Sequence, residues 1–320
     1  MPIDDIIKVI EKHKSFLVTA HINPEGDAIG SQLAIASLLR QLGKEVRIID
    51  NDSVPETLKW LPGAKEIELS KDIKECKFDA ALVLDSPNIE RIGDVARLTK
   101  GSDIVNIDHH VSNEKFAKIR WVDPHMSSCG EMVFHIYKAM KEAIPIDSAM
   151  NMYIAIATDT GSFRYSNTSG DTHNVAAELI KMGIKPEEIS EKIYEQKDFA
   201  SVKLIGECVS TVQVTPDKRI AYLEARRDMF KRTGSRPEDT ENFINFARMI
   251  KGVDVAIFFR EADDGKTHVS FRSKGNFDVN TLATAFDGGG HRKASGCTLD
   301  LDLEKAKKKV LKKTKEMLSE

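Results

Sequence analysis

Three side chains that can bind a metal ion lie close together near the start of the chain. His21, Glu25 and Asp27 follow the apolar run 16–18 and lead into residues 28–42, whose apolar spacing predicts a helix. They therefore occupy the turn between a buried strand and a helix N-terminus, where open α/β sheets bind ligands. One imidazole and two carboxylates form a plausible set of metal ligands. Acids at a helix start also favour the helix dipole, so this cluster alone does not decide between the two interpretations.

Three further apolar runs end in acids or histidines. They are residues 80–84 before Asp85, residues 103–107 before Asp108-His109-His110, and residues 154–158 before Asp159. In a parallel sheet the C-terminal ends of the strands share one edge, so these side chains are expected to converge on one crevice. The last run extends back to residue 147 and contains Ala and Met, which favours a helix. Asp159 is therefore expected at the end of a helix.

The number of carboxylates in this predicted crevice indicates bound cations. Carboxylates gathered in one place repel one another unless cations neutralise them. Two divalent ions about 3.5–4 Å apart are the usual arrangement in phosphoester hydrolysis. The mixture of histidines and carboxylates favours Mn²⁺, because Mg²⁺ and Ca²⁺ prefer sites made only of oxygen atoms. We expect two Mn²⁺ ions, with Mg²⁺ as the other candidate.

Two motifs carry a resemblance to a known family. The triplet Asp108-His109-His110, with His21-x-x-x-Glu25-x-Asp27 upstream, resembles the DHH phosphoesterase superfamily. The stretch Gly288-Gly289-Gly290-His291-Arg292-Lys293-Ala294-Ser295-Gly296 resembles the glycine-rich signature of the DHH-associated C-terminal domain. Their order and separation are similar to those of the compact bacterial oligoribonuclease and 3'-phosphoadenosine 5'-phosphate phosphatase group (nano-RNases). The family usually carries Asp at the position of Glu25, whose extra methylene shifts the carboxylate.

The resemblance implies roles for the predicted site residues. His21 and Glu25 would bind one ion, Asp85 would bridge both ions, and the other ion would be held by Asp27, His109 and Asp159. His110 would contact the phosphoryl group or the leaving oxygen. Asp108 would orient its neighbours, although a simple turn-capping acid is an alternative. The resemblance also implies a homodimer.

Further residues are expected to bind substrate. Arg164 lies in a hydroxyl-rich loop directly after Asp159. By resemblance, Arg272 and Ser273 at a strand end would hold a phosphate. The glycines Gly288, Gly289 and Gly290 allow a close backbone approach, and successive N–H groups of such a loop can cradle a phosphate. His291 follows them directly and would contact the phosphate or the base.

Composition limits the class of ligand and the compartment. The chain has 320 residues and a net charge of −3, so no global basic field attracts long double-stranded nucleic acid. A short RNA or a small nucleotide, held by a few local cationic groups, is expected instead. The four cysteines lie far apart, which indicates free thiols in a reducing cytoplasm. The first residues lack a signal-peptide core, and no apolar run approaches the ~20 residues that a membrane helix requires.

The chain order predicts two α/β domains. Residues 1–190 are expected to form a mostly parallel catalytic domain, 191–212 a linker, and 213–320 a smaller substrate-binding domain with a mixed sheet. The active site is expected in the cleft between them. In the second domain the patterns predict a hairpin at Asp263-Asp264-Gly265. They also predict strands at 209–215, 219–224, 253–260 and 267–272, and helices at 238–250, 279–286 and 303–318.

The leading hypothesis is a metal-dependent phosphoesterase acting on very short RNA, on 3'-phosphoadenosine 5'-phosphate, or on both. A phosphodiesterase for linear dinucleotides from cyclic dinucleotide signalling remains a close alternative. Family II pyrophosphatases share the N-terminal motifs but not the glycine-rich signature. A longer single-strand exonuclease would need more chain and a broader basic groove. A nucleotide-binding regulator without turnover is the alternative from another class, and the apparently complete ligand set disfavours it.

Overall fold

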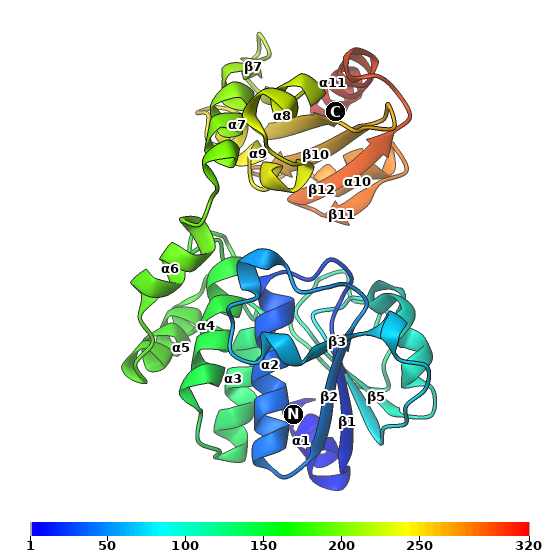
Figure 1. Cartoon of the computed structure of the whole chain (residues 1–320), viewed down its shortest axis with the longest axis vertical. Coiled ribbons are helices and arrows are strands. Elements are labelled where there is room, and N and C mark those ends of the chain that lie inside the picture. The colour runs from blue at the N-terminus through cyan, green and yellow to red at the C-terminus, as the bar shows by residue number, and fades with distance from the viewer. Residues whose placement is uncertain (1, 320) are drawn as a thin grey trace. The chain divides into compact units, whose positions relative to one another are not determined.

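A parallel sheet of six strands organises the N-terminal part of the chain. In the computed structural model, which describes residues 2–319 apart from the side chain of His291, this part is one of two units, 1–196 and 197–320 (Figure 1). The sheet order is β3-β2-β1-β4-β5-β6, and each neighbouring pair is parallel. The strands are β1 (Ser15–Thr19), β2 (Glu45–Asp50), β3 (Ile67–Leu69), β4 (Ala80–Leu84), β5 (Asp103–Asp108) and β6 (Ile119–Val122).

The two faces of this sheet bury alternate residues of each strand. Phe16 and Val18 of β1 face a core shared with the helices, whereas Leu17 faces the opposite side, which is covered by the 3-10 segment η4 (Glu90–Thr99). Because both faces are covered, the strands are almost continuously apolar, as parallel strands usually are. The helices are α1 (Pro2–Lys12), α2 (Gly26–Gln41), α3 (Cys129–Met140), α4 (Ile146–Asp159), α5 (Gly170–Lys181) and α6 (Pro186–Tyr194). Short 3-10 turns complete the unit at η1 (Glu56–Leu58), η2 (Ala64–Glu66) and η3 (Ser70–Asp72).

The strand order creates a crevice between β1 and β4. The chain forms β1, β2 and β3 towards one edge of the sheet, then returns to β4 and continues to β5 and β6 towards the other. Neighbouring connections therefore diverge at the C-terminal ends of β1 and β4, which is the position where such sheets bind ligands. The predicted parallel fold of this domain is confirmed, and so is the helix that ends at Asp159.

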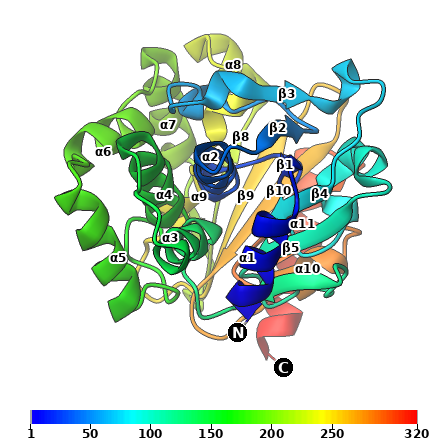
Figure 2. The same ribbon diagram turned by 90° about the horizontal axis from the view of Figure 1, so that it is seen from below.

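Close contacts between helices depend on two glycines. Helix α2 lies beside α4, with α3 next to both (Figure 2). A methyl group on Gly30 of α2 would overlap the backbone carbonyl oxygen of Asn151 in α4, and one on Gly130 of α3 would overlap the methyl group of Ala155. The absent side chains let the three helices approach closely enough to hold the loops between them in place.

The second unit contains a mixed sheet, as predicted. Its order is β11-β12-β10-β9-β8-β7, in which β8 and β9 are parallel and the other pairs antiparallel. The strands are β7 (Gln213–Val214), β8 (Ile220–Ala225), β9 (Val255–Glu261), β10 (Thr267–Ser273), β11 (Gly289–His291) and β12 (Ala294–Leu299). The helical segments are α7 (Phe199–Ser210), α8 (Arg227–Thr233), η5 (Pro237–Thr240), α9 (Ile244–Arg248), α10 (Val279–Thr284) and α11 (Leu303–Ser319). The predicted hairpin at 263–265 joins β9 to β10.

Two predictions for this unit are wrong. The proposed strand 209–215 begins inside α7, whose Leu204 and Cys208 are buried one helical turn apart, and only Gln213 and Val214 are extended. The proposed helix 238–250 is interrupted, because Asn242 adopts a left-handed backbone with φ of 67°. Asparagine tolerates that conformation better than most residues, so the chain turns there between η5 and α9.

The glycine-rich stretch is a hairpin arm. Gly289 and Gly290 lie in β11, which pairs with β12 at the edge of the sheet. A methyl group on Gly288 would overlap the carbonyl oxygen of Gly296, and Gly290 has a φ of 142°. The close approach of the two strands therefore requires glycine at these positions. Among the described residues, no helix combines the length and apolar character needed to cross a bilayer.

Asp50, at the end of β2, is a buried acid. Its oxygens accept hydrogen bonds from the Thr19 hydroxyl at 3.3 Å, the Ala20 amide at 3.3 Å and the Gln32 side-chain amide at 3.2 Å. Burial is the dominant effect and raises the pKa of Asp50 to about 7. These hydrogen bonds tie β1 and α2 to β2.

We predict that Gly30→Ala lowers the free energy of unfolding by about 1–3 kcal/mol, because the added methyl group overlaps the Asn151 carbonyl. Gly170→Ala is the matched control in the same unit. Its added methyl group meets open space, so the change should be neutral or stabilising by up to about 1 kcal/mol. Urea unfolding followed by circular dichroism measures both, and equal stabilities of the two variants would contradict the packing argument.

We predict that Asp50→Asn reduces the pH dependence of stability in the metal-free protein. The pKa of Asp50 is raised to about 7 in the folded protein, compared with about 3.9 in the unfolded chain. Protonation of Asp50 therefore stabilises the folded state fully below about pH 3.9, and this contribution to the free energy of unfolding is lost as the pH rises through about 7. This loss amounts to at most about 4 kcal/mol. The free energy of unfolding of the variant, relative to that of the parent, should therefore be higher at pH 8 than at pH 5. Chelator-treated samples unfolded at both pH values test this, and an unchanged difference would contradict it.

Candidate metal centre

His21 and Asp85 face each other across the crevice between β1 and β4. His21 follows β1, and its Nε2 lies 3.4 Å from Oδ2 of Asp85, which directly follows β4. The Nδ1–H of His21 donates to the carbonyl oxygen of Ile22 at 2.7 Å, so Nε2 is the ring nitrogen that faces the carboxylate. Asp85 is buried and has a left-handed backbone with φ of 51°, a strained conformation of the kind that accumulates at functional sites.

His109 places one ring nitrogen among three carboxylates. Its Nδ1–H donates to the carbonyl oxygen of Met126 at 3.2 Å, which leaves a lone pair on Nε2. This Nε2 lies 3.6 Å from Oδ2 of Asp27, 3.6 Å from Oδ1 of Asp85 and 3.7 Å from Oδ2 of Asp159. A lone pair facing three carboxylates is unfavourable unless a proton or a cation lies between them.

Asp27 also joins two helix starts. It lies in the first turn of α2 and accepts hydrogen bonds from the backbone amides of Cys129 at 2.7 Å and Gly130 at 2.9 Å, the first residues of α3. Carboxylates are favourable at a helix N-terminus. The same contacts orient the carboxylate towards His109, so the interpretation based on the helix dipole and the one based on metal binding both apply to this residue.

Asp108 orients His110. The carboxylate is fully buried at the end of β5 and accepts a hydrogen bond from Nδ1 of His110 at 2.7 Å. Asn113 donates to its other oxygen at 2.6 Å. Nδ1 of His110 also lies 3.5 Å from Oδ1 of Asp85. Asp108 therefore holds the imidazole in one tautomer and one orientation beside the crevice.

Asp159, the last residue of α4, is held by a side chain that follows it in the next loop. The amide of Asn167 donates to Oδ2 of Asp159 at 3.0 Å, to its carbonyl oxygen at 3.3 Å, and to the carbonyl oxygen of Ser127 at 2.9 Å. One amide thus ties the end of α4 to the segment that precedes α3. This contact fixes the carboxylate on the side of the crevice where His109 lies.

The geometry of the cluster fits a metal ion. Within residues 2–319, Oδ1 of Asp85 is buried and has no hydrogen-bond partner. Donor atoms of Asp85, His109 and His110 all lie within 4.8 Å of one another, and so do those of Asp27, Asp85 and Cys129. A buried carboxylate oxygen without a partner is costly in the polypeptide alone. The cluster can therefore hold a metal ion.

The pKa values show how strongly these charges interact. Burial opposes a charge on His21, but the hydrogen bond and charge of Asp85 outweigh burial and raise the pKa of His21 to about 9. Burial likewise opposes a charge on His109, whose pKa is raised by Asp85, Asp159 and Asp27. Burial raises the pKa of Asp159 to about 7, and nearby Asp85 and Glu25 add to this effect. Protons balance the carboxylates in the polypeptide alone, so a metal that binds here should displace them.

Two predicted residues of this unit lie apart from the cluster. Glu25 is exposed at the N-cap position of α2, and its charge contributes to the raised pKa of Asp159. It belongs to neither group of converging donor atoms found among the described residues. Arg164 is exposed, and its Nε donates to the carbonyl oxygen of Gly161 at 2.6 Å.

The remaining predicted residues belong to the second unit. Arg272 is half-buried near the end of β10, and one of its guanidinium nitrogens donates to the carbonyl oxygen of Phe271 at 3.1 Å. Ser273 is buried, and its hydroxyl donates to the carbonyl oxygen of Phe277 at 2.8 Å, which keeps it within the fold. Gly288, Gly289 and Gly290 form or precede β11. The side chain of His291 lies outside the described residues. The predicted site between the two domains stays a prediction.

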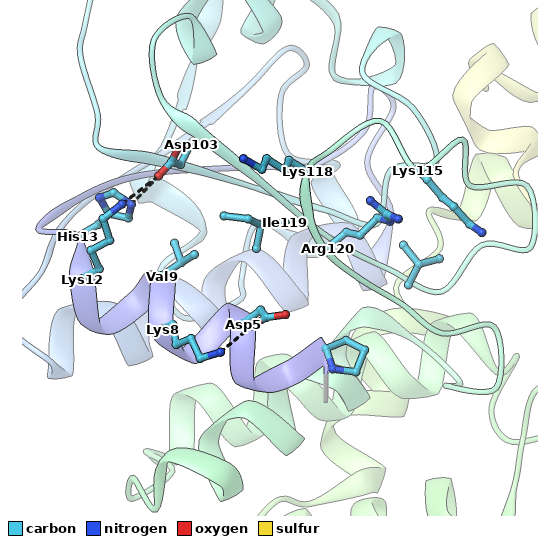
Figure 3. A pocket seen from close by; sticks show the side chains of 12 residues that line it. Asp5, Lys8, Val9, Lys12, His13, Asp103, Lys115, Lys118, Ile119 and Arg120 are labelled. Carbon is cyan, nitrogen blue, oxygen red and sulfur yellow. Dashed lines mark hydrogen bonds and ion pairs between the residues drawn. The ribbon is translucent and has the colours of Figure 1, made fainter.

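A groove of about 620 Å³ lies elsewhere on the first unit, between α1 and β6 (Figure 3). No predicted site residue appears among the described residues that line it. Asp5 is paired there with Lys8 at 2.9 Å, and Asp103 with His13 at 2.9 Å. Its carboxylates are therefore neutralised by neighbouring bases, unlike those around His109.

Sequence reasoning missed three supporting residues, namely Asn113, Asn167 and Cys129. Each lies in or just after a loop that returns to the crevice. Asn167 belongs to the hydroxyl-rich loop after Asp159, and Cys129 is one of the four free cysteines. The hydroxyl-rich loop after Asp159 was a signal for Asn167, whereas no pattern in the sequence points to Asn113.

Comparisons with known proteins agree with this geometry. The model described as "DHH family, N-terminal domain" matches residues 15–158, and the "DHHA1 domain" model matches residues 217–320. The chain is 32% identical over 317 residues to the "Bifunctional oligoribonuclease and PAP phosphatase NrnA" of Thermus thermophilus, covering 98% of this chain and 93% of that protein. It is 30% identical over 300 residues to the Bacillus subtilis protein of the same name, covering 92% of each.

A solved structure is also similar over nearly the whole chain. The crystal structure of an exopolyphosphatase-related protein from Bacteroides fragilis superimposes with a TM-score of 0.93 at 31% sequence identity. The match covers 100% of this chain and 98% of that protein. The family resemblance carried by the two sequence motifs is confirmed. The chain belongs to the DHH family of phosphoesterases, contains a DHHA1 domain, and is a hydrolase of that family.

Proposed function

We propose that the chain hydrolyses very short RNA oligonucleotides and 3'-phosphoadenosine 5'-phosphate with the help of two divalent cations, Mn²⁺ in preference to Mg²⁺. The observation that carries this proposal is the placement of Nε2 of His109 within 3.7 Å of three carboxylates. The substrate class is supported by the names of the Thermus and Bacillus relatives. The preference for Mn²⁺ is supported by the mixed nitrogen and oxygen donors.

The two ions would be held on either side of Asp85. Oδ2 of Asp85 faces His21, and Oδ1 faces His109, which is the orientation a bridging carboxylate requires. His21 with Glu25 would complete one site, and His109 with Asp27 and Asp159 the other. Bound there, the cations would generate a nucleophilic water near neutral pH and neutralise charge on the phosphoryl oxygens.

The chain itself would position the substrate and one proton donor. His110, held by Asp108 at 2.7 Å, would contact the phosphoryl group or the leaving oxygen. Asn113 keeps Asp108 in place at 2.6 Å. This arrangement supports His110 as the acid that protonates the leaving oxygen, because Asp108 stabilises the charged imidazolium.

The second domain would limit substrate length. Residues 1–190 would contain the catalytic residues, and residues 213–320 would bind the substrate. In the second domain, Arg272, the glycine-rich arm and His291 would contact phosphate. The net charge of −3 supports a grip on few phosphates rather than on a long strand. We also infer a cytoplasmic homodimer: the dimer rests on the family resemblance, and the compartment is supported by four free thiols. Analytical ultracentrifugation tests the dimer.

A turnover panel with Mn²⁺ tests the function. The substrates are 3'-phosphoadenosine 5'-phosphate, pyrophosphate, RNA of two to five nucleotides, linear dinucleotides and a 24-mer. Rapid hydrolysis of the first and of the short RNAs, with a slow 24-mer, is expected. A 24-mer degraded as fast as a trinucleotide would overturn the length limit, and binding without turnover would favour a regulator.

We predict that Asp85→Asn lowers turnover at least a hundredfold while the protein stays folded. Asparagine tolerates the left-handed backbone at this position, so the change removes charge without adding strain. Titration calorimetry with Mn²⁺ should show the loss of at least one bound ion. A variant that binds two ions and keeps near-parental activity would contradict the bridging role of Asp85.

We predict that Glu25→Asp is tolerated and Glu25→Ala requires more Mn²⁺ for the same activity. The carboxylate at this position is exposed, so its removal should leave the fold intact. Activity of the parent and both variants is measured across a metal titration. Identical metal dependence in all three proteins would show that Glu25 is not a ligand.

A further inference from the structure

One face of the second sheet is hollowed over β10 and β12. Along β10, Val269 and Phe271 point into the core that includes α10 and α11, whereas His268, Ser270 and Arg272 point to the opposite face. There, η5 and α9 cover only part of the sheet, and a hollow of about 450 Å³ remains between Thr240–Ile244 and the strands. This volume lies in the range of pockets that hold a small molecule.

The strand register places Ser270 of β10 in the middle of the hollow and large basic residues at its two ends. Ser270 lies between Gly296 of β12 and Phe258 of β9, so the floor is low only over Ser270 and Gly296. Two residues along β10 in one direction lies Arg272. Two residues along in the other direction lies His268, directly between its cross-strand partners Arg260 of β9 and Thr298 of β12. The four residue steps from His268 to Arg272 span about 13–14 Å at the rise of an antiparallel strand. Arginine side chains leaning inward can close much of that span.

Arg260 lacks the acid that a half-buried arginine usually has. In the part of the chain that the structure describes, no carboxylate lies within ion-pair distance of its guanidinium. Burial is the main influence on this group and lowers the pKa of Arg260, with a small opposing effect from Glu238. Burying part of a cation without a partner costs free energy. An anionic ligand would remove that cost.

His268 is positioned to assist Arg260. Its Nδ1 is hydrogen-bonded to the hydroxyl of Thr298 at 2.9 Å, which fixes the ring on the floor of the hollow. Burial and the charge of Arg260 lower the pKa of His268, so the ring is neutral and can donate one hydrogen bond without adding charge. The end of the hollow opposite Arg272 therefore offers a forked cation and a fixed imidazole.

We propose that this hollow binds one nucleotide unit of the substrate, with Arg272 on one phosphate and Arg260, assisted by His268, on a second. The inference rests on the proposed function, which supplies the nucleotide substrate. It assigns the Arg260 end as a subsite for a second phosphate group. The ligand class is a nucleotide with phosphates at both ends, either a free nucleoside 3',5'-bisphosphate or a 5'-phosphorylated oligonucleotide.

The first test is binding without turnover. Adenosine 3',5'-bisphosphate and adenosine 5'-monophosphate are titrated into the chelator-treated full-length protein, its Arg260→Gln variant and the control Arg232→Gln. Arg232 is exposed and paired with Glu207 and Asp228, away from the hollow. Arg260→Gln should weaken the bisphosphate roughly tenfold to a hundredfold and the monophosphate less than twofold. Equal losses for both ligands, or a loss matched by the control, would overturn the subsite.

A second experiment distinguishes a free bisphosphate from a 5'-phosphorylated oligonucleotide as the source of the second phosphate. It also tests whether the Arg260→Gln variant is folded. With Mn²⁺, kcat/KM for ApA and pApA is compared in the same proteins. A subsite that serves oligonucleotides predicts a tenfold loss for pApA alone, and one that serves only free bisphosphates predicts no loss for either. Arg260→Gln should keep or raise the Tm without ligand and lose the upward shift that the bisphosphate gives the parent. The binding arm decides the subsite even if the parent hydrolyses neither dinucleotide.

Discussion

Three carboxylates, two of them buried and the third partly buried, share one imidazole nitrogen, and this is the constraint on which the first domain depends. Asp27, Asp85 and Asp159 lie within 3.7 Å of Nε2 of His109. Their repulsion opposes folding, and the surrounding hydrogen bonds hold them together against it. Amides at the start of α3 fix Asp27, and Asn167 fixes Asp159. The preformed site thus lowers the free energy of unfolding, and a bound cation would balance its charge.

The parallel sheet explains how residues far apart in the chain reach this site. His21 follows β1 and Asp85 follows β4, and the connections that leave these two neighbouring strands run towards opposite edges of the sheet. Asp159 comes from a helix, and it reaches the crevice because α4 lies close against α2, where Gly26 and Gly30 leave room for Thr158 and Asn151. The close packing of α2 and α4 therefore also determines the position of the third carboxylate, Asp159.

Much of this organisation could be predicted from patterns along the chain. Apolar runs that end in acids predicted the strands before Asp85 and Asp108 and the helix before Asp159, because each pattern is local. The contacts of Asn113 and Asn167 could not be predicted, since they depend on how loops return to the crevice. In the second domain, the helix predicted at 238–250 failed at Asn242, where one left-handed residue interrupts an otherwise suitable apolar pattern. The hollow beside Arg260 needed the register of three strands, which no local pattern supplies.

The backbone at two acidic positions also determines how freely each can change during evolution. Asp85 has a φ of 51°, which side chains other than those of Gly, Asn and Asp rarely adopt, and among these only Asp carries a charge. A change to Glu there would keep the charge but would place a residue that favours this backbone less than Asp does in the same left-handed conformation. Glu25 has an extended backbone, with φ of −116°, which accepts either acid. An exchange between Asp and Glu at position 25 therefore costs no backbone strain, whereas the same exchange at position 85 adds some.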